Sequence, residues 1–207
     1  MNMFWKKKIT RLKANRYLGN KIEEYMLPCK DFFKEVSEEK NSWIKIPDKA
    51  INGLIHELLF IFIYLIQVAK IYEHEDEINN LLQDLPPSVK NNKKIDITKY
   101  LDRFQEIDEV MKFVFNNAQN QGGIGSGILS FCLRKLPNEV INEIKINPTE
   151  EILEFFTNYL RLNVNDIGKD ELLYSGFPMM SGVVIGEMIR RFIKELNDHF
   201  KWKKVIK

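Results

Sequence analysis

The feature that most constrains this chain is an unbroken run of nine apolar residues, from Leu58 to Ile66. A helix that is apolar on every side must be buried in a protein core or inserted in a membrane. A spanning helix needs about 20 largely apolar residues. Extending the run to Ile51–Ala69 brings in the polar pair His56 and Glu57. The pattern therefore favours a buried core helix over a membrane-inserted one.

The rest of the chain repeats apolar residues every three or four positions, which is typical of amphipathic helices. We expect two helices that meet at Gly19-Asn20, and further helices over about 48–83, 96–118, 128–136, 137–146, 148–162 and 178–200. Neither an internal repeat nor a convincing pair of strands is visible in the sequence. The predicted fold class is all-α: an irregular bundle of about seven or eight helices around a central apolar helix.

The segment 86–94 is the best candidate for a linker, because it holds two Pro, one Ser, two Asn and three Lys. We expect one globular helical domain over residues 1–207. A candidate subdomain break at 86–95 would separate the N-terminal helices of 1–85 from the C-terminal helices of 96–207.

Charge is nearly balanced overall, with 31 Lys and Arg against 29 Asp and Glu, but it is unevenly placed. Residues 1–16 carry +6 and residues 199–207 carry +4, and neither stretch contains an acid. The stretch 17–198 between them therefore carries −8.

Three interpretations of the basic ends remain open. The ends are solvated or dock on the acidic surface of the protein itself. Alternatively, a short basic helix with Trp and Ile on one face makes a peripheral contact with anionic lipid. Nucleic acid is the least favoured partner, because the acidic body would repel it. The candidate interaction or lipid surface consists of Trp5, Lys6, Lys7, Lys8 and Arg11.

The basic N-terminus is not followed by an apolar stretch of the kind found in a secretory signal. Cys29 and Cys132 are then expected to be buried, reduced thiols. We therefore expect a cytoplasmic protein.

The pair His56-Glu57 is the most distinctive polar feature of the apolar segment. It begins like a zinc metalloprotease motif, but Phe60 stands where the second His ligand is required. One interpretation is a buried polar pair satisfied by neighbouring helices. The other is a polar spot in an apolar cavity, with His56, Glu57 and Tyr64 as candidate ligand-binding residues. No catalytic residue, metal site or cofactor is predicted.

The glycine-rich stretch Gly122–Gly127 lacks the spacing of a phosphate-binding loop, and its simplest interpretation is a flexible connection or a tight turn. Two glycine pairs have a four-residue spacing that permits close approach of another helix backbone. These pairs are Gly123 with Gly127 and Gly182 with Gly186. The partner is either another helix of the same fold or a second subunit.

The sequence favours a non-enzymatic helical protein that acts through protein–protein interaction, as a regulator, adaptor or inhibitor, or through self-association. The first alternative is a small-molecule-binding or enzymatic bundle with a polar spot at His56 and Glu57. The second alternative is a peripheral membrane protein that contacts anionic lipid through its basic N-terminus.

Overall fold

The computed structural model describes residues 7–39, 42–72, 74–90, 97–147, 149–151, 153–154, 158, 173, 176–201 and 203–206. These residues form an all-α bundle, as expected. Its helices are α1 (Arg11–Glu38), α2 (Asp48–Val68), α3 (Glu75–Asp84), α4 (Pro87–Lys90), α5 (Ile97–Asn117), α6 (Gln121–Arg134), α7 (Asn138–Asn142) and α10 (Phe177–Phe200).

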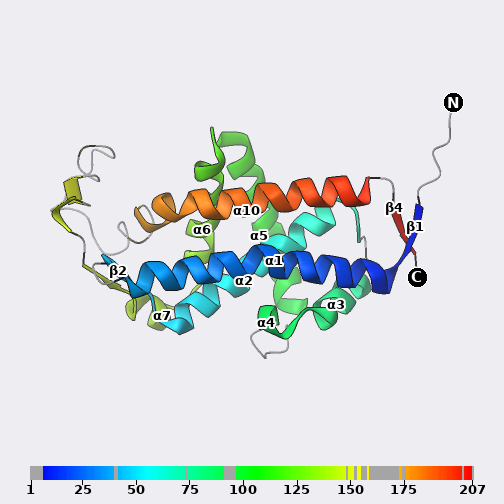
Figure 1. The fold of residues 1–207 in the computed structure, drawn as a ribbon, viewed down its shortest axis with the longest axis horizontal. Coiled ribbons are helices and arrows are strands. Elements are labelled where there is room, and N and C mark those ends of the chain that lie inside the picture. The colour runs from blue at the N-terminus through cyan, green and yellow to red at the C-terminus, as the bar shows by residue number, and fades with distance from the viewer. Residues whose placement is uncertain are drawn as a thin grey trace.

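The two longest helices, α1 and α10, run side by side in opposite directions along the long axis of the molecule (Figure 1). Aromatic contacts follow the whole length of this pair. Tyr17 contacts Phe200, Tyr25 contacts Phe192 and Phe33 contacts Phe177, each with ring centroids 5.8 Å apart. Aromatic pairs of this kind add packing energy beyond the area that they bury.

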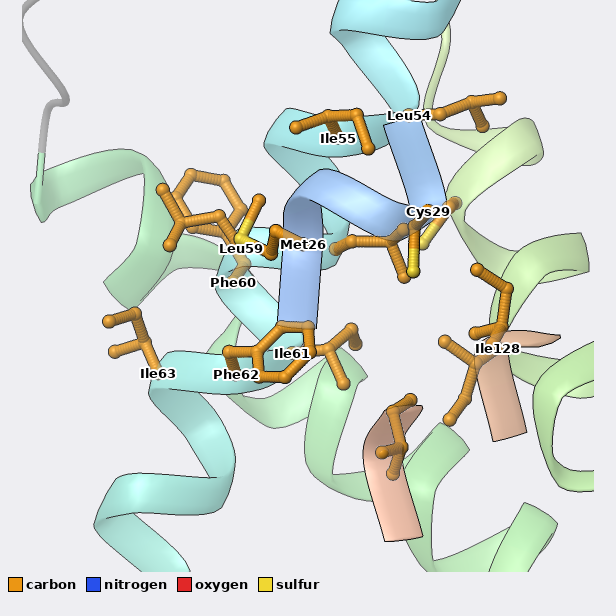
Figure 2. Close-up of a cluster of buried hydrophobic side chains, with 14 of the residues drawn as sticks. Met26, Cys29, Leu54, Ile55, Leu59, Phe60, Ile61, Phe62, Ile63 and Ile128 are labelled. Atoms are coloured by element: carbon orange, nitrogen blue, oxygen red, sulfur yellow. The ribbon is translucent and has the colours of Figure 1, made fainter. Parts of the chain in front are cut away.

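Helix α2 is the central apolar helix. Its side chains from Leu58 to Ile66 are all buried. Figure 2 shows those from Leu59 to Ile63 in one cluster with Met26 and Cys29 of α1 and Ile128 of α6. By length and composition α2 is able to cross a membrane, but 72% of its apolar 18-residue stretch is buried inside the fold. That burial is also what the core helix of a bundle shows.

A short strand pair lies at each end of the bundle. Strand β1 (Lys7–Thr10) pairs in parallel with β4 (Lys203–Ile206), and β2 (Ile44–Lys45) pairs antiparallel with β3 (Lys145–Ile146). The expectation of a short basic helix at the N-terminus was wrong for residues 7–10. These residues are extended because they pair with the other end of the described chain.

Four expected helix boundaries were also wrong. The helix expected over 137–146 ends at Asn142, and Lys145 and Ile146 form strand β3 instead. Helix α1 continues through Gly19 and Pro28 without a break. Helix α6 begins at Gln121, so the glycine stretch is helical rather than a loop. The helix expected over 48–83 ends at Val68, and α3 starts only at Glu75.

The early end of α2 is a Schellman motif. The amide of Lys70 donates to the carbonyl of Gln67 at 2.8 Å, and the amide of Ile71 donates to the carbonyl of Ile66 at 3.3 Å. Lys70 adopts φ 53°, the left-handed conformation that glycine usually supplies at this position. The chain can therefore turn without the glycine that would have marked the turn in the sequence.

The candidate linker contains the short helix α4, and residues 91–96 lie outside the described part of the chain. Buried residues from both sides of it belong to one hydrophobic cluster, in which Ile22 and Leu54 accompany Ile128 and Phe192. The helix expected over 148–162 falls mostly outside the described residues.

Candidate functional site

Glu57 lies inside the bundle and is only 6% exposed. Its Oε2 accepts a hydrogen bond from Nη1 of Arg103 on α5, which makes a largely buried ion pair. Burial raises the pKa of Glu57, and the guanidinium of Arg103 opposes that rise. This carboxyl is therefore bound to a partner within the fold.

His56 points elsewhere, because adjacent residues on a helix are rotated by about 100°. It is half-buried, and its ring meets that of Phe60 edge-on with centroids 4.7 Å apart. Neither His56 nor Glu57 is among the residues that line the pocket at the C-terminal end of α2. The structure thus separates these two residues from the third candidate, Tyr64, which lies about 10 Å further along the helix.

Tyr64 lines a pocket of about 390 Å³ where the C-terminal parts of α2, α5 and α10 meet. Its lining is mostly apolar. The contributing residues are Tyr64, Leu65, Val68 and Ala69 of the α2 end, Met111, Lys112, Phe115 and Asn116 of α5, and Ile193, Leu196 and Asn197 of α10. The volume is within the range of sites that hold small ligands or a large side chain.

The polar edge of the pocket is a chain of hydrogen bonds. The hydroxyl of Tyr64 donates to Oδ1 of Asp108 at 2.8 Å, and Nζ of Lys112 donates to Oδ2 at 2.6 Å. The hydrogen bonds from Lys112 and, to a smaller extent, from Tyr64 lower the pKa of Asp108. Burial is the main cause of the raised pKa of Tyr64. At neutral pH the phenol is protonated and the carboxyl ionised, so this edge offers recognition rather than proton transfer.

The two predicted glycine pairs face different helices. A Cβ on Gly182 would lie 2.5 Å from the Gly122 carbonyl oxygen, and one on Gly186 would lie 1.9 Å from that of Gln121, so both face α6. Gly125 of α6 lies against both of them, since a Cβ on it would meet the backbone of Gly182 and of Gly186. Gly123 and Gly127 instead face Ala118 and Val114 of the α5 segment. All four glycines therefore lie against segments of the same chain.

The predicted basic surface is divided. Arg11 turns towards the start of α3, where its Nη2 lies 2.9 Å from Oε1 of Glu77. Lys8 is exposed, and Lys7 lies in β1 beside Lys203 of β4. Trp5 and Lys6 lie outside the described residues.

Neither cysteine has the environment of a reactive thiol. Both are buried, and burial raises the pKa of Cys29 to about 12 and that of Cys132 well above its usual value. Within the described ranges, no three His, Cys, Asp or Glu residues gather as a metal site would require.

Comparisons with models of known protein families, with curated proteins and with solved structures found no match. The case for function therefore depends on the pocket and on the surfaces around it. Sequence reasoning found Tyr64 but missed Arg103 and Asp108. Their helix was expected, but nothing in the sequence shows which α5 residues would face Glu57 and Tyr64.

Proposed function

We propose that this chain is a non-enzymatic binding protein whose pocket between α2, α5 and α10 receives a large apolar side chain of a partner protein. The observation that carries the proposal is the apolar rim. Val68 is 55% exposed and Phe115 is 42% exposed, and both line the pocket. Exposed apolar residues beside a pocket are typical of an interaction site.

The rim favours a protein partner over a small ligand. A ligand inside the pocket would leave the outer surfaces of Val68 and Phe115 in water. A partner that inserts one anchoring side chain would cover them with its own backbone and flanking residues. Interfaces are commonly dominated by a few such anchors, with Trp and Tyr prominent, in desolvated pockets.

Binding is favoured over catalysis because the polar groups near the pocket are already engaged with each other. Asp108 receives bonds from both Tyr64 and Lys112. A general acid or base would need a group poised to exchange a proton with a substrate.

The test uses peptides selected from a random helical library on the wild-type protein. Phe115→Glu should abolish binding of most selected peptides, because it places a charge on the apolar rim. Phe113→Glu is the matched control: Phe113 is 67% exposed on the same helix but does not line the pocket. Peptides that bind Phe115→Glu as well as wild type would refute the pocket as the binding site.

A small apolar ligand is the second candidate, because the pocket volume also suits one. Native mass spectrometry of the purified chain separates the two. An extra mass that leaves on denaturation, and that is absent from Phe115→Glu, would favour the small ligand.

A further inference from the structure

Phe113 is the most exposed large apolar side chain among the described residues, at 67%. It lies on α5 two residues after Met111, which is buried in the core. Positions two apart on a helix are rotated by about 200°, so Phe113 points away from the bundle. Single apolar residues are common on protein surfaces. The position of Phe113 is notable because of what lies next to it.

The pocket between α2, α5 and α10 lies beside Phe113. Asn116, three residues further along α5, is its neighbour on the helix surface and lines the pocket. Phe113 itself does not line the pocket. One face of this chain therefore presents an exposed aromatic side chain and, next to it, a pocket with an apolar rim.

An anchor and a pocket that lie side by side meet the requirement of a two-fold symmetric contact. In such an interface, residue i of one copy contacts residue j of the other, and residue j of the first contacts residue i of the second. A two-fold axis through this part of α5 sets the two α5 helices antiparallel. Each Phe113 can then enter the pocket of the other copy.

The charges around this face do not oppose a second copy. In a chain of which 29% is charged, no charged residue occurs from Phe113 to Leu133. An antiparallel arrangement sets the exposed Glu109, one turn before Phe113, against this uncharged stretch and not against its own counterpart.

The cations nearest the pocket are paired within the chain. Nζ of Lys112 lies 2.6 Å from Oδ2 of Asp108, and Nζ of Lys194 lies 2.8 Å from Oδ2 of Asp198. Neither pair adds net charge to the face. Two identical copies can therefore approach each other here without the repulsion that a charged surface would cause.

We propose that this chain forms a symmetric dimer in which Phe113 of each copy occupies the pocket of the other. The proposal rests on the proposed function and identifies the partner as a second copy. The contact would also cover Phe115 and Val68 on the rim. Aromatic residues and Met are enriched in the cores of such interfaces. Because the contact is centred on the end of α5, the dimer is small in interface area and reversible.

Sedimentation velocity of the full chain over a concentration series measures the association. Wild type should show a monomer–dimer equilibrium. Phe113→Ala removes both anchors and should raise the dissociation constant about 1,000-fold, since each anchor contributes about 30-fold. Met180→Ala is the matched control, because Met180 is 48% exposed on α10 and does not line the pocket. It should dimerise as wild type does.

A mixture of two variants tests the anchor and the pocket separately. Val68→Glu puts a charge on the rim of the pocket but keeps the anchor, whereas Phe113→Ala removes the anchor but keeps the pocket. In the mixture, Phe113 of the first chain can enter the intact pocket of the second. This heterodimer should be about 30-fold weaker than the wild-type dimer and about 30-fold tighter than either variant with itself. Circular dichroism verifies that each variant is folded.

The outcomes separate this proposal from the proposed function. A wild type that is monomeric up to about 1 mM, a dimer that Phe113→Ala leaves unchanged, or a mixture without the heterodimer would each overturn the self-association. If the selected peptides then still lose affinity for Phe115→Glu, the pocket remains the binding site and the anchor comes from a different protein. Peptides that bind Phe115→Glu as well as wild type would overturn both proposals.

Discussion

Gly125 of α6 lies directly against Gly182 of α10, with no room for a side chain between the two backbones. A Cβ on Gly125 would lie 1.8 Å from the Gly182 carbonyl oxygen and 2.5 Å from the Gly186 amide nitrogen. Glycine in a helix costs about 1 kcal/mol relative to alanine. In α6 and α10 this cost is offset because the absence of side chains lets the two helices pack backbone to backbone.

Gly125→Ala should therefore destabilise the protein despite the better helix propensity of alanine. The methyl group meets rigid backbone, so α6 and α10 must separate. We expect a loss of about 3 kcal/mol, the upper end of the range for overpacking. Urea unfolding followed by circular dichroism measures it.

Gly19→Ala is the matched control, because a Cβ there would meet Pro86 Cδ at an ordinary 3.4 Å. This substitution should be neutral or should stabilise the protein by up to about 1 kcal/mol. If Gly125→Ala behaves in the same way, the close packing of α6 on α10 is not present in solution.

The ion pair between Glu57 and Arg103 predicts a pH-dependent loss of stability when Arg103 is replaced. Burial raises the pKa of Glu57 above the ordinary 4.5, even with Arg103 opposing it. The protonated carboxyl of Glu57 contributes stability that is fully present below pH 4.5. This contribution is lost as the pH rises through the pKa of Glu57 in the folded state. Arg103→Met removes the opposing charge, so the pKa should rise further and the loss should grow with pH.

At about pH 7.5 we expect Arg103→Met to cost about 2–3 kcal/mol, less than a fully buried pair because Arg103 is 30% exposed. Near pH 4 the cost should be small. Denaturant unfolding at both values measures the difference, and Glu57→Gln combined with Arg103→Met should remove most of its pH dependence. A loss that is the same at both pH values would show that Glu57 does not titrate as described.

Lys70 predicts a stabilising substitution. Its φ of 53° costs a non-glycine residue about 1–2 kcal/mol. Glycine avoids this strain, but its greater backbone freedom stabilises the unfolded chain by roughly 0.5–1 kcal/mol. Lys70→Gly should therefore raise the free energy of unfolding by about 0.5–1 kcal/mol. Lys34→Gly, inside α1, should lower it by about 1 kcal/mol. Thermal unfolding of the two variants should move in opposite directions, and a fall for Lys70→Gly would contradict the left-handed turn.

These residues also explain what the sequence could predict. Apolar periodicity was enough for the all-α class, for the core helix and for α5, because those depend on local spacing. It failed where tertiary contacts override local signals. The sequence gives no sign of the turn at Lys70. Gly19 suggests a break, but it is buried within the continuous helix α1. The Gly122–Gly127 stretch is helical because α10 lies against it.

The same limit applies to the candidate site. Tyr64 was identifiable as a polar tip in an apolar run, but its partner Asp108 is 44 residues away on another helix. The pocket forms because the ends of three helices converge. That convergence cannot be predicted from the spacing of residues in a single sequence. The junction of β1 with β4 is likewise a contact between distant segments.

Neighbouring asparagines on α5 provide a final test of the pocket. Asn116 lines it, whereas Asn117 points away and donates to the Phe113 carbonyl at 2.7 Å. Asn116→Trp should cover the opening with an indole and weaken binding of an apolar dye such as anilinonaphthalene sulfonate about tenfold, equivalent to about 1.4 kcal/mol. Asn117→Trp should bind the dye as wild type does. Because both positions are exposed, stability should stay within about 0.5 kcal/mol in each variant. Equal dye affinity in the two variants would mean that the dye, and by extension an apolar anchor of a partner, binds elsewhere.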